Sequence, residues 1–225
     1  MKIRVWGWAF LLLAVMTRTA SAGDDYQYWQ QFSLKPYKSE KVDFLIFSDS
    51  RFVSDAQALG LYFFSPRLTY HYSRNLDLGL NYTHIQSRRV NPSVTDESFN
   101  FQHRAEVEVN PQWQITDGMK LKMRNRVEFR WIEGRGSDNT RYRQRWTIDL
   151  PVKKAGFLKS VYVNSEFFYD AARRNINENR SVPLGLNFKL NDKTGVSVFW
   201  MIQSQKGRRD WSSNQILGTL FSLSF

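Results

Sequence analysis

The stretch from Lys120 to Trp131 restricts the fold more than any other part of the chain. Its even-numbered residues are all charged, whereas its odd-numbered residues are apolar except for Asn125. Successive side chains of a β-strand point to opposite faces of the sheet. A strand here therefore has one charged face and one apolar face that suits lipid. The charged set is Lys120, Lys122, Arg124, Arg126, Glu128 and Arg130, and the apolar set is Leu121, Met123, Val127, Phe129 and Trp131.

The segments on either side repeat this division. In the preceding segment the charged or polar positions are Gln102, Arg104, Glu106 and Glu108, and the apolar positions are Phe101, Ala105, Val107 and Val109. In the following segment they are Arg141, Arg143, Arg145 and Asp149 against Tyr142, Trp146, Ile148 and Leu150. As antiparallel neighbours, the three segments share a wall of guanidinium and carboxylate groups.

The same alternation recurs along the whole chain and predicts an all-β protein, an antiparallel transmembrane β-barrel of about 10 to 12 strands. Most segments reach the roughly 9 to 11 residues that a tilted strand needs to cross a bilayer. The negative mean hydropathy is compatible with this fold, because only alternate residues face lipid. Aromatic residues, 16% of the chain, suit interfacial girdles. A soluble periplasmic sandwich or lipocalin-like barrel is the alternative. The predicted strands are Tyr26–Lys35, Val42–Arg51, Leu61–Tyr72, Leu76–His84, Phe99–Asn110, Met119–Trp131, Arg141–Leu150, Ser160–Tyr169, Ser181–Leu190, Thr194–Gln203 and Gln215–Phe225.

The C-terminal residues favour the membrane barrel over the soluble one. Alternating large residues lead to an aromatic at the last position, where soluble domains usually have a frayed polar tail. This ending resembles the final strand of bacterial outer-membrane barrels, whose terminal Phe is read by the barrel assembly machinery. We expect a periplasmic C-terminus and an assembly signal formed by Leu217, Phe221, Leu223 and Phe225.

The N-terminal residues have the pattern of a secretory signal peptide. Lys2 and Arg4 precede an apolar run over residues 5–16, and Ala20-Ser21-Ala22 follows. We expect cleavage near Ala22, so that residues 1–22 are the signal peptide and 23–225 form one outer-membrane barrel domain. Cleavage removes three cations and no acid, which lowers the formal charge from +11 to +8. No cysteine is present for a disulfide or a thiolate metal site.

Connection lengths alternate when counted back from a periplasmic C-terminus. Turns on the periplasmic side are short or modest, and loops on the outer side are longer and charged, as in outer-membrane barrels. With eleven strands and a periplasmic C-terminus, the first strand would begin outside the cell. Single-chain bacterial barrels instead have even strand numbers. Ten and twelve strands both remain open. The predicted turns are 36–40, 73–75, 111–118, 151–158 and 191–193, and the longer loops are 87–98, 132–140, 170–180 and 206–214.

The charged wall leads to two functional hypotheses. Across its three strands nine cations face four acids, and such a surplus attracts phosphate or carboxylate groups, which Arg binds bidentately. This predicts a narrow channel or binding site for small anionic solutes. Alternatively, the ion pairs fill the lumen as a polar core, which gives a plugged structural or surface-interaction barrel. The candidate lumen residues are Arg104, Glu106, Glu108, Arg124, Arg126, Glu128, Arg130, Arg141, Arg143, Arg145 and Glu166, the last as a counter-ion.

Other chemistry has weak support. His71, His84 and His103 lack metal-ligand spacing, so we expect no metal site and no cofactor. Ser87 and Asp96 near His84 leave a rim-sited hydrolase as the less favoured exception to a non-enzyme. The basic composition would suggest nucleic acid, but the expected compartment excludes it. Outer-membrane lipid and the phosphates of lipopolysaccharide are the expected partners of the basic loops.

Several short motifs together resemble one bacterial family. They are Trp29, Asp49 with Arg51, His103-Arg104 with Glu106, Arg141-Tyr142-Arg143, Glu166-Phe167, and Asn179-Arg180 before Leu184-Gly185-Leu186. Over most of residues 24–225 the chain is similar to the outer-membrane family named domain of unknown function 2490, although Asp49 stands where Glu is expected. The resemblance implies an outer-membrane barrel and brings no substrate or reaction.

Overall fold

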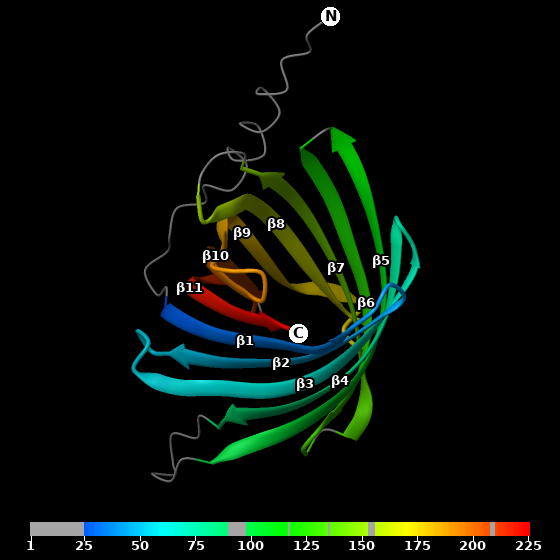
Figure 1. The fold of residues 1–225 in the computed structure, drawn as a ribbon. Coiled ribbons are helices and arrows are strands. Elements are labelled where there is room, and N and C mark those ends of the chain that lie inside the picture. Colours follow the sequence, from blue (N-terminus) through cyan, green and yellow to red (C-terminus); the bar gives the residue numbers. More distant parts are fainter. Residues whose placement is uncertain (1–24, 90–97, 117, 135, 153–155, 208–209) are drawn as a thin grey trace, which may run out of the picture.

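Eleven strands form a closed ring in the computed structural model (Figure 1). The structure describes residues 25–89, 98–116, 118–134, 136–152, 156–207 and 210–225. The predicted all-β barrel is confirmed, and a two-sheet sandwich is excluded by the closed ring. The strands are β1 (Tyr26–Lys38), β2 (Val42–Val53), β3 (Ala58–Ser73), β4 (Leu76–Arg88), β5 (Phe99–Thr116), β6 (Met119–Ile132), β7 (Gly136–Pro151), β8 (Leu158–Asp170), β9 (Asn175–Lys189), β10 (Thr194–Lys206) and β11 (Trp211–Ser224).

The ring closes through a parallel pair. Strands β1 and β11 run side by side from Tyr26↔Gln215 to Lys35↔Ser224, whereas every other neighbouring pair is antiparallel. A parallel closure requires an odd number of strands, so the expectation of ten or twelve was wrong. The first predicted strand, Tyr26–Lys35, is one of the eleven strands of the ring. Tyr26 and Phe225 therefore lie at opposite ends of the barrel, called here the loop end and the turn end.

The strands are longer than the sequence predicts, mostly toward the loop end. Strands β7, β9 and β11 take in much of the predicted loops 132–140, 170–180 and 206–214, and β5 takes in most of the predicted turn 111–118. The hydrophobic alternation stops earlier than the backbone ladder, because backbone pairing needs no apolar side chains. The expected signal peptide and the centre of loop 87–98 lie outside the described residues.

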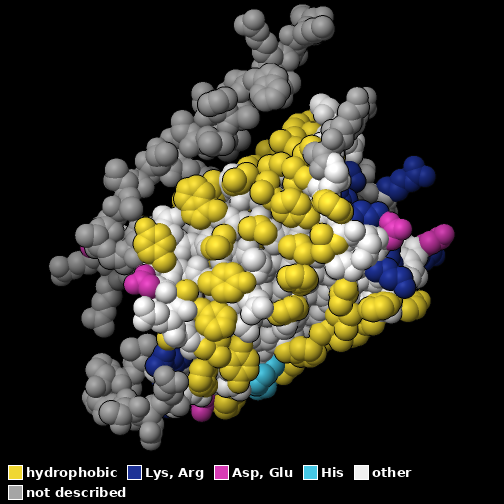
Figure 2. Space-filling view, turned by 60° about the vertical axis from the view of Figure 1, so that its left-hand side comes forward, with side chains coloured by type: hydrophobic (Ala, Val, Ile, Leu, Met, Phe, Trp, Pro, Cys, Tyr) yellow, Lys and Arg dark blue, Asp and Glu magenta, His cyan; other side chains and the backbone are white. Residues whose placement is uncertain are grey.

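The outer surface is a broad apolar band with most of its charges at the rims (Figure 2). Leu80, Phe129 and Trp200 are exposed there to 59%, 45% and 47%. Large apolar side chains that face outward from a closed barrel suit lipid contact. The four residues of the expected assembly signal also lie on this exposed side: Leu217, Phe221, Leu223 and Phe225. No helix in the described part of the chain is long and apolar enough to cross a membrane.

The inside of the barrel has two different halves. Strand β6 lies five strands from β1 and five from β11 around the ring. The charged wall therefore stands opposite the parallel pair β1 and β11, called here the seam. On the seam side the buried core is apolar: Trp29, Val182, Phe199, Met201 and Ile216.

Two glycines let inward-facing aromatic rings lie directly on the backbone of the next strand. A Cβ at Gly218 would lie 2.0 Å from a ring carbon of Phe199, and one at Gly185 would lie 2.2 Å from a ring carbon of Tyr162. Such contact distances leave no room for any side chain at these positions. The rings therefore pack flat against the barrel wall beside the lumen.

Candidate functional site

The lumen encloses a cavity of about 810 Å³. Ten cationic side chains and five carboxylates line it, and two further carboxylates, Glu108 and Glu128, lie directly behind in contact with the lining arginines. Positive charge therefore exceeds negative charge at this site. The cations are Arg51, Arg67, Arg104, Lys122, Arg124, Arg126, Arg141, Arg143, Arg145 and Arg180, and the lining acids are Asp49, Glu106, Asp149, Glu166 and Glu178.

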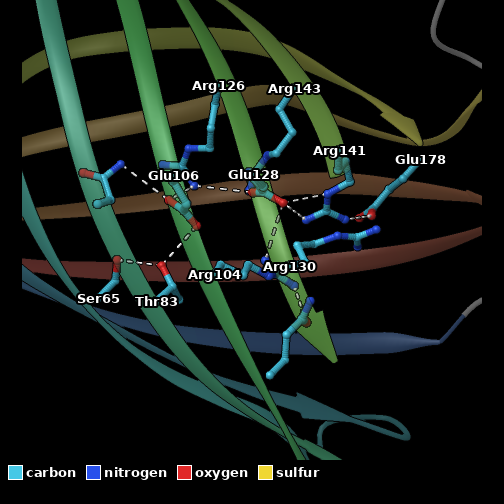
Figure 3. A network of polar contacts seen from close by, with 12 residues as sticks. Ser65, Thr83, Arg104, Glu106, Arg126, Glu128, Arg130, Arg141, Arg143 and Glu178 are labelled. Carbon is cyan, nitrogen blue, oxygen red and sulfur yellow. Dashed lines mark hydrogen bonds and ion pairs between the residues drawn. The ribbon is translucent and has the colours of Figure 1, made fainter. Parts of the chain in front are cut away.

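Glu128 on β6 is the centre of the ion-pair network (Figure 3). Its two carboxylate oxygens lie 2.7 Å from Arg141 Nη2 and 2.6 Å from Arg143 Nη1. Arg126 and Arg104 add longer contacts of 3.7 and 3.9 Å. The side chain has no exposed surface. One carboxylate thus joins strands β5, β6 and β7 through four guanidinium groups.

Arg126 extends the network toward β4. Its Nη1 lies 2.8 Å from Glu106 Oε2, and its Nε donates to Glu108 Oε1 at 2.6 Å. Glu106 also accepts from Thr83 Oγ1 at 3.0 Å, and Thr83 contacts Ser65 Oγ at 2.8 Å. Ionic and neutral hydrogen bonds therefore link β6 to β3 across two intervening strands.

Glu166 and Glu178 extend it in the other direction. Glu166 on β8 accepts from Arg124 Nη2 at 2.6 Å and from Arg143 Nε at 3.0 Å. Glu178 on β9 lies 2.6 Å from Arg180 Nη2 and accepts from Gln203 on β10 at 2.5 Å. Glu178 Oε2 also lies 3.7 Å from Arg141 Nη1. Carboxylates from two further strands thus form ion pairs with arginines of the charged wall.

Aromatic rings link the ion-pair network to the seam through contacts with arginines. The guanidinium carbon of Arg51 lies 3.6 Å from the centroid of the Trp29 ring, and that of Arg180 lies 5.1 Å from it. Arg180 also lies 4.7 Å from the Phe168 ring, which Arg143 approaches to 4.4 Å. Cation–π contacts of this kind stabilise desolvated arginines. They connect β2 and β1 to β9, β8 and β7.

Side-chain exposure changes along the lumen. Lys122 and Lys35 near the turn end are 45% and 26% exposed, whereas Glu128 and Arg126 are 0% and 4% exposed. Solvent therefore reaches lumen side chains at the turn end, whereas the side chains of the central ion pairs are buried.

Two lining arginines have no carboxylate partner among the described residues. Arg67 donates to Ser65 Oγ at 3.3 Å and stacks 4.1 Å from the Phe47 ring centroid. Arg145 stands across from Arg124 on β6 and from Glu166 on β8 in the strand register, and its Nε is buried without a hydrogen-bond partner in the described structure. Like charges placed directly opposite are unfavourable in a sheet. An anion beside Arg145 would relieve both defects.

The structure places all eleven lumen candidates on the inner side of β5 to β8. Eight line the cavity, and Glu108, Glu128 and Arg130 belong to the surrounding ion pairs. Sequence reasoning did not place Arg67 and Glu178 at the site, because only the closed ring brings their strands around the same lumen. Trp29, Asp49, Arg51 and Arg180 had a signal in the family-like motifs, although their contacts had none.

The remaining candidates are dispersed. His84 and His103 face outward with ring centroids 4.9 Å apart, whereas His71 faces Asp77 inside the turn end at 2.7 Å. The described residues contain no group of three side chains that suits a metal ion. Ser87 Oγ donates to the Asn100 carbonyl at 3.5 Å, and Asp96 lies outside the described residues.

Comparison with known proteins gives one match. Residues 26–214 match the family model described as "Protein of unknown function (DUF2490)". No curated protein and no solved structure matches the chain. The matched region covers ten strands and the start of β11, so it includes the whole charged wall.

Proposed function

The chain belongs to the DUF2490 family, and from its lumen we propose that it is an integral outer-membrane barrel that binds small anionic solutes inside. The observation that carries the proposal is the pair Arg67 and Arg145. Both line the cavity, and neither has a carboxylate partner in the described structure. Partly buried guanidinium groups without an ion pair favour an anionic partner, because a charge-assisted hydrogen bond offsets part of their desolvation.

The proposed location rests on the outward apolar band and on the signal-peptide pattern of the sequence. The mature chain is expected in the outer-membrane fraction. Unboiled samples are expected to migrate differently from boiled ones in SDS gels, because a closed hydrogen-bonded barrel resists detergent. Recovery of the folded protein from the soluble periplasmic fraction would reject the membrane location.

Anion binding is testable with inorganic phosphate and the purified barrel in zwitterionic lipid nanodiscs. Phosphate is expected to raise the thermal midpoint, because a ligand that binds only the folded state stabilises it. Arg67→Gln and Arg145→Gln are each expected to weaken phosphate binding about tenfold to a hundredfold, the effect of losing one hydrogen bond to a charged group. Calorimetric titration gives the affinities.

The matched control is Lys189→Gln, which removes one cation from the exposed end of β9. Its phosphate affinity should equal that of the unchanged protein, since Lys189 lies outside the lumen lining. Equal affinities for all three variants would assign the binding to the surface and contradict a lumen site.

A plugged structural barrel is the second candidate, favoured by the exclusion of solvent around Glu128. It shares the buried central ion pairs with the first candidate and differs in lacking a ligand. Planar-bilayer recordings address conduction directly: a steady anion-selective current would show a path through the lumen. Absence of both current and phosphate binding would leave the structural role.

A further inference from the structure

We propose that the ligand of the lumen is an amphipathic anion, a carboxylate or phosphate carried on an apolar body. This inference rests on the proposed anion-binding function and specifies its ligand class. A site for inorganic ions alone would require only the charged wall. The cavity has two chemically different walls.

The apolar wall lies across the ring from the charged wall of β5 to β7. Leu45 and Phe47 on β2, Phe199 on β10 and Leu220 on β11 all line the cavity. These strands flank or form the parallel seam, which stands across the ring from β6. Apolar side chains in a lumen gain nothing from water, whereas they stabilise an apolar ligand surface in proportion to the area they bury.

The charged end of the ligand is assigned to Arg145 and Arg67. Arg145 projects from β7 in the charged wall, while Arg67 projects from β3 next to the apolar wall and stacks on Phe47. The two arginines line the same cavity as Leu220. A ligand with its anionic group at either arginine therefore shares the cavity with apolar side chains that can contact its remaining atoms.

The cavity size agrees with such a ligand. Its volume of about 810 Å³ falls in the range of roughly 300 to 1,000 Å³ that is typical of small-molecule sites. Lumen side chains near the turn end are partly exposed, whereas the central ion pairs are not.

The test uses a series of linear carboxylates, namely acetate, butanoate and hexanoate, with the barrel in zwitterionic lipid nanodiscs. Affinity is expected to rise about threefold to fourfold for each added methylene group that enters the site. Hexan-1-ol has the same chain without the charge and is expected to bind far more weakly than hexanoate. Calorimetry measures all four ligands, and empty nanodiscs give the lipid background.

Leu220→Ala should reduce the gain in affinity from acetate to hexanoate. The matched control is Leu184→Ala, which shortens an outward-facing leucine exposed to 47%. If Leu220→Ala does not fold, Leu45→Ala makes the same test from β2. Equal binding of acetate and hexanoate, with phosphate binding intact, would overturn the amphipathic ligand but keep the anion site. Failure of phosphate and every carboxylate to bind would overturn both.

Discussion

Replacing Glu128 by Gln is expected to lower the free energy of unfolding by about 3 to 5 kcal/mol, the usual cost of removing one partner from a buried ion pair. The substitution preserves the size of the side chain and removes its charge. Arg141 and Arg143 then lose a buried carboxylate at 2.7 and 2.6 Å. Unfolding by denaturant in a constant detergent, followed by the loss of heat-modifiable migration, measures the change.

The control is Asp192→Asn, because the Lys189–Asp192 pair lies at the surface with 95% of the Asp192 side chain exposed. Solvent screens such a pair, so no measurable change is expected. A double variant with Glu128→Gln and Arg141→Gln should recover part of the loss, since it also removes a stranded cation. Identical stabilities of Glu128→Gln and the unchanged protein would show that the network is hydrated and not a polar core.

Phe225→Ala is expected to remove most of the folded barrel from the membrane while leaving the stability of the folded remainder unchanged. The Phe225 ring is 66% exposed and contacts Lys193 Nζ only at 5.5 Å, so it adds little to the folded state. Its backbone N–H, which donates to the Lys35 carbonyl at 3.1 Å, is retained in the variant. A loss of yield would therefore report recognition during assembly.

Phe157→Ala is the matched control, because Phe157 is 67% exposed in the turn that joins β7 to β8 at the same end of the barrel. Quantitative immunoblotting of unboiled membrane samples gives the folded yields. A deletion in the predicted loop 206–214 would not serve as a control, since Ser212 there pairs with Gln205 inside the β10–β11 ladder. Equal yields of the two Phe variants would remove Phe225 as an assembly signal.

The location of each strand was predictable because alternation is a local property of the sequence. Glu128 and Arg130 belong visibly to one face in the sequence, and the structure places both in the interior. Which charges pair was not predictable, since it depends on the register between strands. Register sets Arg124 across from Arg145 and Glu106 across from Glu128, which are like charges. It also sets Glu108 across from Arg126 and Glu128 across from Arg141, whereas other attractive contacts run diagonally or to strands further away.

The register also changes which arginines are in surplus. The nine-to-four imbalance on β5, β6 and β7 suggests that Arg124, Arg126 and Arg143 have spare charge. In the structure all three are ion-paired, because Glu166 contributes from β8 and Glu108 and Glu128 each serve nearby arginines. Arg67, on a strand outside the wall, is one of the two that lack a carboxylate partner in the described structure.

The parallel seam has a practical consequence for labelling and engineering. An epitope fused ahead of Tyr26 and another fused after Phe225 would stand at opposite rims, because β1 and β11 run in the same direction. In a membrane the two epitopes would be accessible to antibody or protease from opposite compartments, whereas an even-stranded meander presents both termini to one compartment. For the same reason, circular permutation of this barrel needs a linker that spans its full height.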